Sequence, residues 1–169
     1  MASAGRQTFL AVTNIAVSLM ALVVLYTLIS SYIYRRGTEL QSGQPLPPAT
    51  SLRLATETPT LLVAIKAGCI YCERSMPFYR QLAGMQRDGQ LGAKVQVLVA
   101  DEPVQAGHVL RIYGIQLPYI GGVDLTSMKI PGTPTLVLVK PDSTVVKTWI
   151  GALSPQKETE VLSAIRKDK

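Results

Sequence analysis

The sequence predicts an α/β fold, in which a central mixed sheet is flanked by helices and preceded by one apolar N-terminal segment. In the first half of the domain, short β-prone stretches alternate with helical ones, and this order is typical of parallel strands joined by crossover helices. The last two predicted strands are separated only by Pro141-Asp142-Ser143, which is typical of an antiparallel hairpin. Both kinds of pairing in one sheet make it mixed.

The apolar N-terminal segment has no charged residue from Gln7 to Tyr34, and residues 9–34 are rich in Leu, Val, Ile and Ala. A helix needs about 20 such residues to cross a bilayer. A cleaved signal peptide is the alternative, but its apolar region would be about 7–15 residues long and would end at small residues. Residues 32–36, YIYRR, make a poor cleavage site. We therefore expect a transmembrane anchor over residues 1–36, with the lipid bilayer as its partner.

Residues 37–51 are predicted to be a linker, because Gly and Pro are interspersed there with Ser, Thr and Gln. Such a composition buries little apolar surface, and its prolines keep the chain extended. Residues 52–169 remain as a domain-sized segment.

The net charge is +6, but the basic residues are scattered among acidic ones without a stripe or cluster. We therefore expect no nucleic-acid partner.

The first half of the domain is predicted to run strand, helix, strand, helix. Residues 60–65, TLLVAI, are short, apolar and β-prone. Residues 70–87 are predicted to form a helix. Residues 93–100 contain KVQVLV, in which apolar residues alternate with polar ones before the run becomes fully apolar. A second helix is expected near residues 103–113.

The second half of the domain begins with an irregular stretch, followed by two strands and a helix. Residues 135–140 contain TLVLV and form the first of these strands, and residues 144–150 form the second. The closing helix is predicted over residues 155–167. Ser154 is its N-cap and Pro155 its first residue, and the helix buries an apolar face.

Cys69 and Cys72 are the only cysteines, and they stand where the strand at 60–65 is followed by the helix at 70–87. Residues i and i+3 of a helix face the same side, about 5–6 Å apart, so the two thiols can form a disulfide. The helix dipole and free N–H groups favour a thiolate there. A purely structural disulfide is disfavoured, because so short a loop restrains the unfolded chain little. We expect a redox site in which Cys69 is the nucleophile and Cys72 resolves the mixed disulfide.

This order of elements, with a Cys-x-x-Cys motif at the first helix, resembles the thioredoxin fold. Pro77 lies where thioredoxin-like proteins kink the active-site helix, and Gly132-Thr133-Pro134-Thr135 resembles the family's cis-proline loop. The long segment before Pro134 and the single anchor resemble membrane-tethered bacterial thioredoxins of the TlpA and ResA type. The resemblance covers residues 52–169.

The resemblance implies a thiol–disulfide oxidoreductase that serves cell redox homeostasis without a cofactor or metal. It implies cysteine-containing protein substrates and a membrane or soluble thiol–disulfide redox partner. It also implies a single-pass protein of the bacterial inner (cytoplasmic) membrane with its domain on the extracytoplasmic side. Charges at the two ends of the apolar segment do not decide this topology.

Three features depart from the family's pattern. Val63 stands where thioredoxins usually have a buried Asp that assists proton transfer, and Gly68 stands where an aromatic residue usually precedes the first Cys. Ile70-Tyr71 between the cysteines matches neither the Gly-Pro of reductants nor the Pro-His of strong oxidants. Because no cation within the motif stabilises the Cys69 thiolate strongly, we expect a reductant or exchanger rather than a strong oxidant.

Four further residues are expected to support the site. The resemblance implies that Pro134 is cis and that the Thr133 backbone pairs with an extended substrate segment. The ammonium of Lys66 could lower the pKa of a nearby thiol or simply reach solvent. Tyr71 could tune the potential or present its ring to the substrate. His108, the only histidine, is expected on a helix, at the surface or partly buried.

A Cu(I)-binding chaperone is the alternative function. Two soft thiolates could hold Cu(I), and copper chaperones of the thioredoxin fold are similar to this chain in anchor and fold. They pair their cysteines with an adjacent histidine, whereas His108 has no obvious route to the thiols. Two Cys and one His also fall short of a structural zinc site. A peroxidase is disfavoured, because Lys66 replaces the Thr that peroxiredoxins place three residues before their cysteine.

Overall fold

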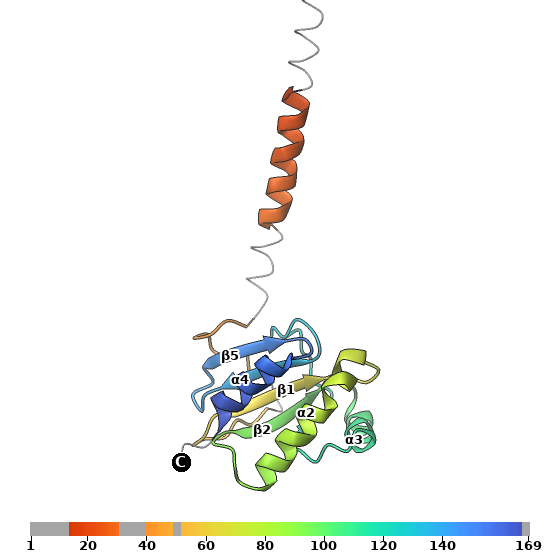
Figure 1. Cartoon of the computed structure of the whole chain (residues 1–169), viewed down its shortest axis with the longest axis vertical. Coiled ribbons are helices and arrows are strands. Elements are labelled where there is room, and N and C mark those ends of the chain that lie inside the picture. Colours follow the sequence, from red (N-terminus) through yellow and green to blue (C-terminus); the bar gives the residue numbers. More distant parts are fainter. Residues whose placement is uncertain (1–13, 31–39, 49–51, 167–169) are drawn as a thin grey trace, which may run out of the picture. The chain divides into compact units, whose positions relative to one another are not determined.

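The computed structural model describes residues 14–30, 40–48 and 52–166. The chain divides into two compact units, Met1–Thr38 and Glu39–Lys169. In the first unit, residues 14–30 form a helix (Figure 1). Its apolar side chains are exposed. None of the helices described is at once long and apolar enough to cross a membrane. Both ends of the predicted span at 9–34 lie outside the described residues.

The second unit is built on a five-stranded sheet with the order β3-β2-β1-β4-β5. β1 pairs parallel with β2 and antiparallel with β4, so the predicted mixed sheet is confirmed. β3 is a two-residue strand at one edge and lies in the stretch predicted to be irregular. The strands are β1 (Thr60–Ile65), β2 (Lys94–Val99), β3 (Tyr119–Ile120), β4 (Thr135–Val139) and β5 (Val145–Ile150).

Three helices of this unit follow the predicted order: α2 (Ile70–Arg87), α3 (Pro103–Ile112) and α4 (Pro155–Ile165). Ser154 is the N-cap of α4, as predicted, and its side chain accepts a hydrogen bond from the Lys157 backbone N–H at 3.5 Å. Pro77 lies inside α2. Figure 1 shows α2 and α4 on one side of the sheet.

Alternate residues of the central strand β1 supply the two faces of the core. Leu61, Val63 and Ile65 join the cluster formed with buried residues of α2, α3 and α4. Leu62 and Ala64 point to the opposite face. That face is covered by irregular segments, through the apolar residues Leu40, Leu46, Leu52, Leu54, Val123, Met128 and Ile130. All of β1 is therefore buried, and its C-terminal end emerges at one rim of the sheet.

Residues 40–48, predicted to be part of an extended linker, pack against β5 instead. The Gly43 backbone N–H donates a hydrogen bond to the Val145 oxygen at 2.8 Å. Leu40 and Leu46 are only 5% and 6% exposed. The composition suggested too little apolar surface to hold this segment against the domain. Two buried leucines are enough here because the edge strand also offers unpaired backbone groups for hydrogen bonds. The rest of the predicted linker lies outside the described residues.

Candidate active site

The loop that leads from β1 to Cys69 is held by Asp101, which follows the neighbouring strand β2. The Ala67 backbone N–H donates to the carboxylate oxygen Oδ2 of Asp101 at 2.6 Å. Gly68 has a φ of 66°, and a Cβ there would meet no atom within 4 Å. Its left-handed backbone, rather than lack of space, is what favours glycine. An aromatic residue at this position would have a strained backbone.

Cys69 is the N-cap of α2. Its Sγ accepts a hydrogen bond from the Cys72 backbone N–H at 3.2 Å, which satisfies one free donor of the first turn. The Cys69 thiol also lies 3.4 Å from the Thr133 carbonyl oxygen, to which it donates. The Thr133–Pro134 peptide bond is cis, and Pro134 is buried.

Sheet register explains why residues 64 positions apart meet. β4 runs antiparallel to β1, and Thr135 pairs with Ala64 near the end of β1. The residues just before Thr135 therefore lie beside those just after Ile65. Antiparallel pairing alone places the Thr133–Pro134 loop against the cysteine pair.

The two thiols differ sharply in environment. Cys69 is partly exposed, whereas Cys72 is fully buried, and both are free. Desolvation raises the pKa of Cys69, but side-chain hydrogen bonds with Cys72 and Thr133 and backbone N–H groups of Cys72 and Tyr71 outweigh it, so the pKa lies below its usual value. Burial, followed by the hydrogen bond with Cys69, raises the pKa of Cys72 to about 12. The pair thus has one thiol that ionises readily and one that resists ionisation.

Lys66, Tyr71 and Val63, the other residues considered for the site, have no side-chain hydrogen bond to either cysteine among the contacts that the structure describes. The Lys66 side chain is exposed, and the Lys66 backbone is the part that lowers the pKa of Cys72 through a hydrogen bond. Tyr71 is 55% exposed, and the Arg74 guanidinium lies 5.8 Å from its ring centroid. Val63 is fully buried in the core, so an apolar side chain occupies the position of the usual Asp.

Two interactions at the site were not predicted. Asp101 holds the loop before Cys69. The sequence could have indicated this contact, since Asp101 directly follows the predicted strand at 93–100. Because parallel strands end at the same rim, a polar residue after one can reach the loop after the other. The Tyr113 hydroxyl donates to Oε1 of Glu73 at 2.9 Å, which ties the end of α3 to the first turn of α2. Nothing in the local sequence pattern indicates that contact.

His108 lies exposed on α3, and the structure does not bring it to the cysteines. Within residues 14–30, 40–48 and 52–166, no three His, Cys, Asp or Glu side chains are grouped so that they could hold a metal ion.

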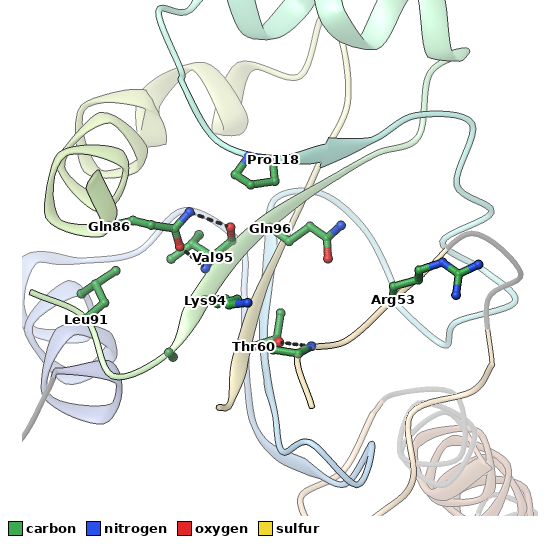
Figure 2. A pocket seen from close by; sticks show the side chains of 10 residues that line it. Arg53, Thr60, Gln86, Leu91, Lys94, Val95, Gln96 and Pro118 are labelled. Atoms are coloured by element: carbon green, nitrogen blue, oxygen red, sulfur yellow. Dashed lines mark hydrogen bonds between the residues drawn. The ribbon is translucent and has the colours of Figure 1, made fainter. Parts of the chain in front are cut away.

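A cavity of about 550 Å³ lies at the other end of the sheet (Figure 2). Thr60 and Lys94, the first residues of β1 and β2, line it, whereas Cys69 follows the last residue of β1. The Gln86 side chain pairs there with both backbone groups of Val95, accepting from its N–H and donating to its oxygen at 3.2 Å. Gln86 thereby satisfies the part of the β2 edge that β3 does not reach, and the cavity is separate from the thiol site.

Comparison with known proteins rests on structure alone, because no family model and no curated protein matches the sequence. The chain is similar to the thioredoxin domain of a thiol-disulfide oxidoreductase from Bacteroides vulgatus, with a TM-score of 0.60 and 17% identity over 76% of this chain and 100% of that chain. It is similar to a thiol-disulfide isomerase from Corynebacterium glutamicum, with a TM-score of 0.56 and 14% identity over 78% and 96% of the two chains.

A third similar structure is a secreted disulfide oxidoreductase from Mycobacterium tuberculosis, with a TM-score of 0.51 and 18% identity over 64% of this chain and 83% of that one. At such identities a likeness shows the fold and not the activity. The predicted thioredoxin-like sheet flanked by helices is confirmed: residues 52–166 have a thioredoxin fold.

Proposed function

We propose that this chain is a thiol–disulfide oxidoreductase that acts through Cys69 and Cys72. The observation that carries the proposal is the asymmetry of the pair. A partly exposed thiol with a lowered pKa begins α2, and a buried thiol with a raised pKa lies one turn later. A thiolate is the attacking species in disulfide exchange, so Cys69 is the thiol suited to external attack and Cys72 is suited to resolution within the protein.

The reaction proceeds in two exchanges. The Cys69 thiolate attacks a substrate disulfide, one substrate sulfur leaves as a thiolate, and a mixed disulfide forms. Cys72 then attacks the Cys69 sulfur, which releases the second substrate sulfur and leaves Cys69 and Cys72 joined. The substrate gains two electrons, and the pair must be reduced again by a thiol–disulfide redox partner, membrane-bound or soluble. Run in this direction, the protein reduces cysteine-containing proteins and contributes to cell redox homeostasis.

The substrate meets the site at the Thr133–Pro134 loop and the exposed Tyr71. Thr133 is partly exposed and its carbonyl lies beside the Cys69 sulfur. An extended substrate segment could pair with this backbone in the manner of an added strand. Tyr71, more than half exposed and two residues after Cys69, offers an apolar contact for the same segment.

The membrane anchor over residues 9–34 is part of the proposal. Its support is the uncharged, apolar sequence and the exposed apolar side chains of the helix at 14–30. We place the protein as a single-pass protein of the bacterial inner membrane, with the thiol site on the extracytoplasmic side. The likeness to a secreted disulfide oxidoreductase supports that side. Cu(I) binding, the alternative, gains no specific observation from the site and stays a prediction.

Trapping of mixed disulfides tests the proposal. In the full-length chain, Cys72→Ser leaves the attacking thiol without its resolving partner, so covalent complexes with cysteine-containing proteins should accumulate on non-reducing gels and disappear on reduction. Cys69→Ser is the matched control, since it keeps one thiol but removes the attacking one, and it should trap nothing. Complexes formed by Cys69→Ser instead of Cys72→Ser would overturn the assignment of roles, and complexes from neither would overturn the activity.

A further inference from the structure

The loop at residues 131–133 presents its backbone to Cys69, but few contacts hold it. Among the contacts that the structure describes, two hydrogen bonds reach this loop, and both end on its carbonyl oxygens, those of Gly132 and Thr133. A Cβ at Gly132 would meet no atom within 4 Å, so packing does not fix the loop there. The position of the Thr133 backbone, with which a substrate segment pairs in the proposed function, therefore depends on these two bonds.

The first bond is lost when the site reacts. The Cys69 thiol donates its proton to the Thr133 carbonyl oxygen, with 3.4 Å between sulfur and oxygen. A thiolate has no proton to donate, and the sulfur of a mixed disulfide has none either. From ionisation of Cys69 until its release from the substrate, this contact cannot hold the loop.

The second bond does not involve sulfur. The Thr135 hydroxyl donates to the Gly132 carbonyl oxygen at 2.8 Å, three residues back along the chain. Thr135 is the first residue of β4, is fully buried, and pairs with Ala64 on one side and Ile150 on the other. Its hydroxyl is therefore carried by the rigid sheet, and the bond to Gly132 persists in every state of the cysteines.

The hydroxyl of Thr135 has no other evident task. The remaining residues of β4 are leucine and valine, and valine would fill the space of Thr135 without burying a polar group. A buried hydroxyl is costly unless it is hydrogen-bonded, and the one bond described for this hydroxyl goes to Gly132. What threonine adds here over valine is thus a hold on the loop that faces Cys69.

We propose that Thr135 is a positioning residue, whose buried hydroxyl keeps the Thr133 backbone aligned for an extended substrate segment while Cys69 reacts. This inference rests on the proposed function and deepens it. A loop that is already ordered spares the substrate the entropic cost of ordering it. Disulfides within an extended peptide should gain from this alignment, whereas a small disulfide without a peptide backbone should gain little.

Two disulfides of similar chemistry separate this role from general damage to the site. One is the symmetric disulfide of the blocked pentapeptide Gly-Val-Cys-Val-Gly, and the other is bis(2-hydroxyethyl) disulfide, which has no peptide backbone. Reduced full-length chain is mixed with an excess of each, and its remaining free thiol is measured by alkylation over time. In Thr135→Val, the rate constant for the peptide relative to that for the small disulfide should fall about threefold to tenfold. A higher half-saturating peptide concentration, rather than a lower maximal rate, should account for the fall.

Three further variants complete the test. Thr135→Ser keeps the hydroxyl and should restore the wild-type ratio of the two rate constants. Thr60→Val is the matched control, because Thr60 is also buried and also begins a strand, but its hydroxyl accepts from the Ala55 N–H at 3.3 Å at the other end of the sheet (Figure 2). Its ratio should equal that of the wild type. Thr135→Ala also lacks the hydroxyl and decides the matter if Thr135→Val does not fold.

The possible results distinguish the positioning role from the proposed function. A wild-type ratio in Thr135→Val would overturn the role of the hydroxyl, and so would an equal fall in Thr60→Val or no recovery in Thr135→Ser. A wild-type chain that loses no free thiol to either disulfide would overturn the proposed function instead.

Discussion

Cys69 and Cys72 are chemically unlike although a single helical turn joins them. The N-cap position gives Cys69 the Cys72 N–H as a donor at 3.2 Å, and the apolar face of α2 takes Cys72 out of water. The first turn of α2 thus places Cys69 in a positive electrostatic potential at the helix N-terminus and removes Cys72 from water on its inner face. Selective reactivity of the two thiols follows from position alone.

Iodoacetamide should therefore modify Cys69 before Cys72 in the reduced full-length chain. Alkylation follows the thiolate, and the pKa of Cys69 is lowered whereas that of Cys72 is about 12. With rising pH, the Cys69 rate should reach its plateau below the pH expected for an ordinary thiol, while Cys72 stays unreactive throughout the neutral range. Peptide mass spectrometry after timed quenching measures both. Equal labelling of the two thiols at neutral pH would contradict this assignment.

Gly68 has a left-handed backbone conformation in the turn that leads into α2. Because φ is 66° and the space is open, Gly68→Ala should lower the free energy of unfolding by about 1–2 kcal/mol through backbone conformation. Urea denaturation of the full-length chain measures the change. Gly132→Ala is the control, since it is near the site, also lies in open space and has no left-handed backbone. If both substitutions have the same effect, the backbone explanation is wrong.

At the scale of elements, the site depends on contacts between the ends of different strands. Asp101, two residues after β2, binds the backbone before Cys69 at 2.6 Å, and Thr133 before β4 touches the Cys69 sulfur. Both contacts arise because β1 is central and has a parallel and an antiparallel neighbour. The strands position the loops, and the loops position the thiol.

Asp101→Ala should loosen the loop that carries Cys69. Loss of a hydrogen bond to a charged acceptor costs about 1.5–3 kcal/mol, and the Ala67 N–H would lose the acceptor that follows β2. We expect a lower denaturation midpoint and faster amide exchange at residues 66–68, measured by hydrogen–deuterium exchange. Asp142→Ala removes a carboxylate that accepts from the Thr144 N–H within an exposed turn, and it should leave exchange at residues 66–68 unchanged. Unaltered exchange in Asp101→Ala would show that the bond does not hold the loop.

Local sequence patterns predicted the elements well, and long-range contacts poorly. The apolar run of β1, the capped start of α4 and the hairpin at residues 141–143 each carry their signal within a few residues, and all are present. The two-residue β3 is too short to carry a pattern, and residues 40–48 are held by an edge strand about a hundred positions away. Such contacts exist only once the sheet has formed.

The same division applies to the site. The spacing of the cysteines and their place before a helix were visible in the sequence, and so was the proline before β4. The role of Asp101 depends on which strand ends meet.

At the scale of the whole molecule, the apolar segment at 9–34 and the thiol unit that begins at Glu39 are expected to act together as a tethered enzyme. Full-length chain should remain in the membrane fraction after carbonate extraction, because an uncharged apolar span of this length favours stable insertion. A variant with two arginines in place of Leu22 and Val23 should be released, since charges at the centre of a span oppose insertion. A soluble mature form lacking the segment would instead indicate cleavage.

The reduction potential of the Cys69–Cys72 couple tests the central claim most directly. The full-length chain is equilibrated with defined ratios of reduced and oxidised glutathione, and the fraction of free thiol is measured by alkylation. No cation within the motif stabilises the Cys69 thiolate strongly, so we expect a potential nearer thioredoxin's, about −270 mV, than the ~−120 mV of the strong oxidant DsbA. A value more positive than about −150 mV would reverse the direction proposed here. A pair that does not equilibrate with glutathione at any ratio would contradict the account.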